Sequence, residues 1–253
     1  MDSRKHNPDI SAILKSWPYK GGQITARFIK ADDDEPRIQV RLDMGILQMH
    51  ASGRPDGERP EGHESLLEYF EARNDESSAA GEEPAKLNSE ECRALRDEAV
   101  QYYHRYVALL ALEDFEGVVR DTTRNLRVLD LCAEQAETEA DRTVLEQFRP
   151  YITMVRARAM ASQALKENEP RAALLAIDEG LDALRQYFTD QGTPQMFDQS
   201  SEVQMLRGMR DSLVPKLPVS QVAELRTRLA KAIEQENYEL AAILRDELKQ
   251  IKE

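Results

Sequence analysis

The chain has 253 residues, a formal net charge of −13 and 41% hydrophobic residues. This composition is typical of a folded protein with a heavily charged surface, and it argues against a disordered chain. The acidic charge repels phosphate backbones, which argues against broad, direct binding of DNA or RNA.

The two cysteines and the apolar segments also narrow the class of protein. Cys92 and Cys132 form no CxxC pair, so the sequence has neither a zinc ribbon nor a thioredoxin-type redox site, and we expect two reduced thiols in or near a core. No apolar stretch resembles a secretory signal or approaches the length of a membrane span. We therefore expect a soluble, cytoplasmic protein without membrane contact.

Residues 1–73 contain the strand-like part of the chain and predict a small α+β region. Apolar residues alternate along residues 23–30 and 37–44, which predicts two half-buried strands joined by a polar hairpin loop. Gly45 then interrupts the pattern, so either a third strand or a bent second strand follows. The aromatic residues at 17–19 are expected to cover the core or a sheet edge, the alternative being a surface anchor for a partner.

Two similar tetrapeptides, RPDG at residues 54–57 and RPEG at residues 59–62, predict two turns. The alternative is a loop that presents Arg54 and Arg59 to an acidic group. A short amphipathic helix is expected after them, over residues 64–73. Residues 74–88 are small, acidic and poor in apolar side chains, so they are predicted to form a linker.

Residues 89–213 have helical periodicity throughout and predict a central antiparallel bundle. A first helix starts at Ser89 and a turn follows at residues 113–117. A third helix is expected over residues 141–166, broken or kinked at Pro150, and Pro170 opens a fourth helix.

Two helix–turn–helix segments in this region resemble each other and, weakly, the tetratricopeptide hairpin. Their turns lie near Asp114 and near Pro170. Small residues, including Ala157 and Gly180, are spaced so that two helices can approach closely. Tetratricopeptide-like packing and a generic helical bundle both fit the pattern.

The last region, residues 219–253, has the most specific pattern in the chain. Pro218 precedes a natural N-cap at Ser220, and two short helices follow with a narrow apolar stripe of the coiled-coil kind. A hairpin of this length cannot bury enough apolar surface to be stable alone. We therefore expect its stripe to pack on a partner or a second copy, the alternative being that it is simply the last helical pair of the bundle.

This hairpin resembles the UvrB/UvrC (UVR) motif. The motif has a leucine-rich first helix, then a turn with an aromatic residue followed by Glu, then an Ala-Ala pair and the run Leu-Arg-Asp-Glu. The chain matches this pattern at Leu225, Leu229, Ala232, Tyr238, Glu239, Ala241, Ala242, Leu244, Arg245, Asp246 and Glu247. The resemblance implies a protein–protein contact element that pairs with another such hairpin. Relatives with this motif include excision-repair proteins, a protease-chaperone and the activator of a protein-arginine kinase. The predicted partner-binding residues are Val222, Leu225, Leu229, Ile233, Tyr238, Ala241, Leu244, Arg245 and Leu248.

Catalytic motifs are not found in the sequence. It has no GxxxxGK[ST] loop, its four histidines show no HExxH or HxH spacing, and residues 32–34 lack the spacing of a calcium loop. We expect no enzyme activity, no catalytic residues, no cofactor and no metal. The predicted function is that of an adaptor for protein partners, among which we expect another UVR protein or a second copy of the chain. The alternative is an accessory factor of nucleotide excision repair or of a Clp-type protease and stress-response system.

Overall fold

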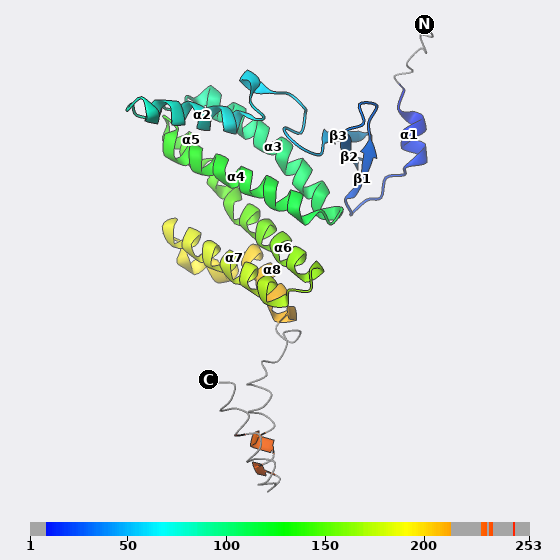
Figure 1. Cartoon of the computed structure of the whole chain (residues 1–253), viewed down its shortest axis with the longest axis vertical. Coiled ribbons are helices and arrows are strands. Elements are labelled where there is room, and N and C mark those ends of the chain that lie inside the picture. Colours follow the sequence, from blue (N-terminus) through cyan, green and yellow to red (C-terminus); the bar gives the residue numbers. More distant parts are fainter. Residues whose placement is uncertain (1–8, 214–228, 232, 235–244, 246–253) are drawn as a thin grey trace. The chain divides into compact units, whose positions relative to one another are not determined.

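We describe the chain from a computed structural model, in which residues 9–213, 229–231, 233–234 and 245 are described (Figure 1). Two compact units are present, Met1–Arg210 and Asp211–Glu253. The described residues are mainly helical, with one small antiparallel sheet near the N-terminus. This architecture confirms the predicted fold class.

The sheet has three strands in the order β1-β2-β3, and both neighbouring pairs are antiparallel. Gly45 therefore separates two strands and does not bend one. Phe28 pairs with Ile38, which pairs with Met49, so these residues share one face. The strands are β1 (Thr25–Lys30), β2 (Pro36–Arg41) and β3 (Ile46–His50).

The strands are shorter than the alternating pattern predicted. Ile24 precedes β1, while Leu42 and Met44 follow β2, and all three side chains are exposed. Ile38 and Met49 are buried on the face that meets the helices. Alternation therefore located the strands correctly but overextended their ends, because apolar residues in the flanking turns continued the period by chance.

Trp17 lies over the opposite face of the sheet, which agrees with the predicted cover for this residue, whereas Tyr19 of the same cluster is exposed. The guanidinium of Arg27 lies 4.0 Å above the Trp17 ring. Arg41 Nε donates a hydrogen bond to the Trp17 carbonyl oxygen over 2.7 Å. Trp17 directly follows helix α1 (Ser11–Ser16), which the sequence analysis did not predict.

The two tetrapeptides form turns, as predicted. Gly57 N donates to the Arg54 carbonyl oxygen over 2.9 Å, and Gly62 N donates to that of Arg59 over 3.2 Å. Gly57 has φ +82°, and a Cβ there would lie 2.3 Å from the His50 ring, so glycine is required both for its backbone and for its lack of a side chain.

The predicted linker at residues 74–88 is wrong in part. Helix α2 (Leu66–Ala79) begins after the N-cap Ser65 and runs through the first six of these residues. Farther on, Leu87 is fully buried, its N–H donates to Gln135, and its carbonyl oxygen accepts from Glu137. The acidic composition therefore reflects an exposed helix face and a short connection, while Leu87 anchors the segment to the core.

The helices that follow pack in chain order: α3 on α4, α4 on α6, and α6 on α7 (Figure 1). The turn after α3 has Glu113 at φ 58°, and the turn after α6 has Asn168 at φ 61°. Their hydrogen bonds correspond, Asp114 N to Leu109 O and Glu169 N to Ala164 O. Two similar helical hairpins are therefore present, and tetratricopeptide-like packing stays a prediction. The helices are α3 (Ser89–Ala111), α4 (Phe115–Gln135), α6 (Arg149–Lys166), α7 (Pro170–Asp190) and α8 (Ser201–Leu213).

The third predicted helix is two helices. A short helix α5 (Glu139–Thr143) and a 3-10 turn η2 (Glu146–Phe148) precede α6. Pro150 lies in the first turn of α6. Backbone N–H groups in the first turn have no acceptor within the helix, so the N–H that proline lacks costs no hydrogen bond there. The proline therefore starts a helix, where the sequence analysis expected a break or kink within one.

Candidate functional site

Three of the nine predicted partner-binding residues lie in the described part of the chain. Leu229 and Ile233 are both helical and are four positions apart in the sequence. Ile233 is 54% exposed, and Arg245 is helical and exposed. The other six, Val222, Leu225, Tyr238, Ala241, Leu244 and Leu248, lie outside the described residues.

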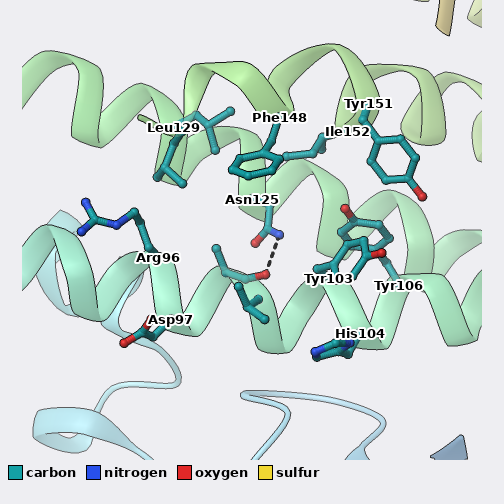
Figure 2. A pocket seen from close by; sticks show the side chains of 13 residues that line it. Arg96, Asp97, Tyr103, His104, Tyr106, Asn125, Leu129, Phe148, Tyr151 and Ile152 are labelled. Carbon is teal, nitrogen blue, oxygen red and sulfur yellow. Dashed lines mark hydrogen bonds between the residues drawn. The ribbon is translucent and has the colours of Figure 1, made fainter. Parts of the chain in front are cut away.

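The described residues also form an apolar groove between α3, α4 and the η2–α6 segment (Figure 2). Its volume is about 580 Å³, within the usual range for ligand sites. Val100 and Phe148 keep about half of their surface exposed at its mouth. We call this feature the α3–α6 groove; it is lined by Arg96, Asp97, Ala99, Val100, Tyr103, His104, Tyr106, Asn125, Leu129, Leu145, Phe148, Tyr151 and Ile152.

Three tyrosines gather at one end of the groove, and Arg96 and Leu129 lie toward the other (Figure 2). The Tyr103 and Tyr106 rings meet edge to face at a centroid distance of 5.5 Å, and the Tyr151 ring lies 6.5 Å from that of Tyr103. Within residues 9–213, none of the three hydroxyls forms a hydrogen bond to the protein. The groove therefore combines a long apolar wall with one end that carries unused hydrogen-bonding groups.

Two of these phenols, Tyr106 and Tyr151, have a pKa above the ordinary value. Burial raises the pKa of Tyr106 and of Tyr151, and the neighbouring tyrosines raise both further. The positive charge of Arg158 lowers the pKa of Tyr151 and so opposes part of this shift. A neutral phenol retains its proton and can donate it in a hydrogen bond.

The sequence analysis did not find this groove. That analysis predicted a helix starting at Ser89 and assigned no role to its tyrosines. In the structure, Tyr102 is buried near Arg105 and Arg124, while Tyr103 faces Tyr151 of α6. The available signal was the pair of adjacent tyrosines, which must point to different faces of one helix.

A buried ionic cluster ties the N-terminal segments to the helices, and it explains the conformation of Arg54. The carboxylate of Glu98 is fully buried. It accepts a hydrogen bond from Leu66 N at the start of α2 over 2.8 Å, and it pairs with Arg124 and, at 3.4 Å, with Arg54. The loop therefore presents Arg54 to an acidic group within the protein, which is a structural role for the residue.

A second buried pair acts beside the first. Arg105 forms a two-point ion pair with Asp121, with bonds of 2.7 and 2.8 Å. Arg105 also donates to the carbonyl oxygens of His50 and Gly53, which lie at and after the end of β3. Both clusters use all of their charges to join chain segments, so they hold the sheet against α3 and α4.

Two other features, a metal site and a membrane-spanning helix, are also absent from the described residues. Within the described residues, no three His, Cys, Asp or Glu side chains are grouped as a metal site would require. None of the helices described is both long and apolar enough to cross a bilayer.

Comparison with known proteins supports one assignment. The family model described as the UvrB/uvrC motif matches residues 220–253. The comparison with curated proteins found no match, and neither did the comparison with solved structures. The C-terminal segment of this chain is therefore similar to the UvrB/uvrC motif, as its leucine spacing and its Leu-Arg-Asp-Glu run predicted.

Proposed function

We propose that this protein is a non-enzymatic adaptor whose C-terminal hairpin, residues 219–253, docks a protein partner or a second copy of the chain. The match of residues 220–253 to the UvrB/uvrC motif is the observation that carries the proposal. That motif mediates protein interactions in repair proteins and in Clp-related proteins. The partner-binding residues are those of the apolar stripe predicted from the sequence.

Physical chemistry supports a docking role for this segment. A helical hairpin of about 35 residues buries too little apolar surface to offset its conformational entropy. In the described residues Ile233 leaves more than half of its surface in water, one turn after Leu229. Covering such a stripe with a partner contributes about 25 cal/mol for each Å² of apolar surface removed from water.

The absence of catalysis and the cytoplasmic location are parts of the same proposal. The sequence contains no nucleotide-binding loop and no histidine spacing of a metalloprotease. We infer that this chain shares the contact element with repair proteins and not their chemistry. A second candidate is an accessory factor that docks on an excision-repair protein or a Clp-type protease, and the description of the motif, which names UvrB and UvrC, favours the first of these.

The test compares the full chain with a stripe variant, Leu225→Asp with Leu244→Asp. Thr227→Asp with Gln250→Asp is the matched control, because both positions lie two residues from a stripe leucine and so on another helix face. Mass in solution and capture of partners from extracts of the native cell are measured for all three proteins. We expect the stripe variant to lose self-association or a captured partner, while the control retains it.

The proposal predicts different results for the two variants. If the stripe variant and a chain lacking residues 219–253 both keep the mass and the partners of the full chain, the hairpin is not the docking element. Capture of an excision-repair protein or of a Clp-type chaperone by the full chain and the control alone would decide between the two partner classes.

A further inference from the structure

We infer that the α3–α6 groove binds a small amphiphilic carboxylate, with its apolar body along Leu129, Phe148 and Ile152 and its carboxylate at the tyrosine end. This site is separate from the C-terminal hairpin and goes beyond the proposed adaptor function. The inference rests on three features: the size of the groove, the unused hydroxyls and the charge near them.

The size and lining of the groove suit a small apolar body. A volume of about 580 Å³ is ample for an aliphatic chain or one to two aromatic rings. Nearly all of the lining surface is apolar, and Leu129, Leu145 and Ile152 form its buried floor. An apolar ligand placed there removes both its own surface and the exposed parts of Val100 and Phe148 from water.

The tyrosine end provides hydrogen-bond donors that the protein does not use. Tyr106 is 1% exposed, yet its hydroxyl has no hydrogen-bonding partner within residues 9–213. The rings of Tyr103 and Tyr151 gather at the same end of the groove, so a ligand oxygen placed there has phenol donors within its surroundings.

Charge selects an anion at this end. Arg158 follows Tyr151 by seven residues, on the same face of α6, and within residues 9–213 it forms no ion pair. The carboxylate of Asp97 lies away from the tyrosines, toward Arg96 (Figure 2). Asp121, whose charge also acts on Tyr106, is paired with Arg105 and Arg120. We therefore infer that a ligand carboxylate lies at the tyrosine end, where the phenols can donate to its oxygens and Arg158 contributes positive charge.

Calorimetry with three ten-carbon probes tests the chemistry of the ligand on the full-length protein. The probes are decanoate, decan-1-ol and decyltrimethylammonium, all below their micelle-forming concentrations. We expect decanoate to bind with one-to-one stoichiometry and at least tenfold tighter than decan-1-ol, since hydrogen bonds to a charged group are the stronger kind. The cationic probe is expected to bind weakest.

Three variants test the location. Tyr106→Phe removes a hydroxyl alone and is expected to weaken decanoate binding about tenfold with little change for decan-1-ol. Val100→Trp fills the mouth of the groove and is expected to abolish binding of both. Leu175→Trp is the matched control, because Leu175 is 60% exposed on α7, away from the groove, and it should bind as the parent does.

Several results would overturn the inference. No binding of decanoate would refute the site, and equal binding of decanoate and decan-1-ol would refute its preference for a carboxylate. Binding that survives Val100→Trp would place the ligand elsewhere. None of these results depends on residues 219–253, so they leave the adaptor proposal to its own test.

Discussion

Cys92 and Cys132 lie in the contact between α3 and α4, and both side chains are fully buried. This confirms that the thiols belong to the core. Burial is the main cause that raises the pKa of Cys132 to about 12, and it also raises the pKa of Cys92. Thiolate is the reactive form, so both cysteines are expected to be inert in the folded protein.

Alkylation rates test this expectation. At pH 8, a cysteine with a pKa near 12 holds about a thousandfold less thiolate than one with the ordinary value of 9.0. In a Cys92→Ala variant we expect iodoacetamide to modify Cys132 at least ~100-fold more slowly in the native state than in guanidinium. Mass spectrometry over time gives both rates, and similar rates would contradict the structure.

Asp141 shows how one carboxylate fixes a short helix. It accepts hydrogen bonds from Ser89, Arg96 and Thr138, and so joins α5 to the beginning of α3. The hydrogen bonds from these three side chains lower the pKa of Asp141 from 3.8 to about 2. A pKa lower in the folded than in the unfolded state stabilises the fold above the unfolded value, and the stabilisation is lost as pH falls through both values.

Because folding lowers the pKa of Asp141, the stability of an Asp141→Asn variant should differ from that of the parent in a pH-dependent way. We expect the variant to be less stable than the parent at pH 7, with the difference shrinking between about pH 4 and pH 2. Urea unfolding at a series of pH values measures it. A difference that is the same at pH 7 and pH 2 would show that the bonds of Asp141 do not depend on its charge.

At the scale of elements, α6 and α7 approach each other closely where Gly180 faces Ala157. The sequence analysis expected small residues to let these helices approach, and Ala157 and Gly180 do so. A Cβ on Gly180 would lie 2.5 Å from the Cβ of Ala157 and 3.1 Å from Leu206 of α8. One methyl group at this crossing therefore has to push two helices apart.

Gly180→Ala is expected to destabilise the protein by about 1–3 kcal/mol, the usual range for overpacking a close contact. Gly208→Ala is the matched control, since nothing lies within 4 Å of its added Cβ, and it is expected to stabilise α8 by up to about 1 kcal/mol. Combining Gly180→Ala with Ala157→Gly should restore part of the loss. Chemical unfolding compares the four proteins, and equal effects of the two single changes would contradict this packing.

Some helices could be predicted from the sequence and others could not, depending on whether the helix carries an apolar stripe of its own. The helices around the turns at Asp114 and Pro170 follow from apolar periodicity, because each needs one buried stripe. Helix α2 beyond Arg73 has no such stripe, so its polar sequence was mistaken for a linker. Pro150 was read as a kink because a proline at a helix start and one within a helix look alike without the backbone.

At the scale of the whole molecule, the chain divides after Arg210 into two compact units. The hairpin at residues 219–253 was predicted as a region of its own, and that boundary stays a prediction. The larger unit has its own core, to which α8 contributes Val203 and Leu206 with no exposed surface. This unit is therefore expected to fold without the hairpin but not without α8.

Two truncations test that organisation. Removing residues 219–253 is expected to shift the thermal midpoint of the main transition by less than about 2 °C, since the larger unit keeps its core. Removing residues 201–253 also deletes Val203 and Leu206, and losing two buried side chains is expected to cost several kcal/mol. Calorimetry measures both, and a large shift for the shorter truncation would show that the hairpin stabilises the rest of the chain.

The sequence by itself determined the fold class, most of the helices, the first two strands and the similarity of the C-terminal segment to the UvrB/uvrC motif, while the structure decided that a third strand follows Gly45. These properties depend on periodicity and on residues near one another in the chain, such as Leu244, Arg245 and Glu247. Only the tertiary structure decided that Arg54 pairs with Glu98, and that Tyr103, Tyr106 and Tyr151 line one groove. Such contacts join α3 to elements about 45 residues before or after it, and a local pattern contains no information on which distant side chain fills the space beside it.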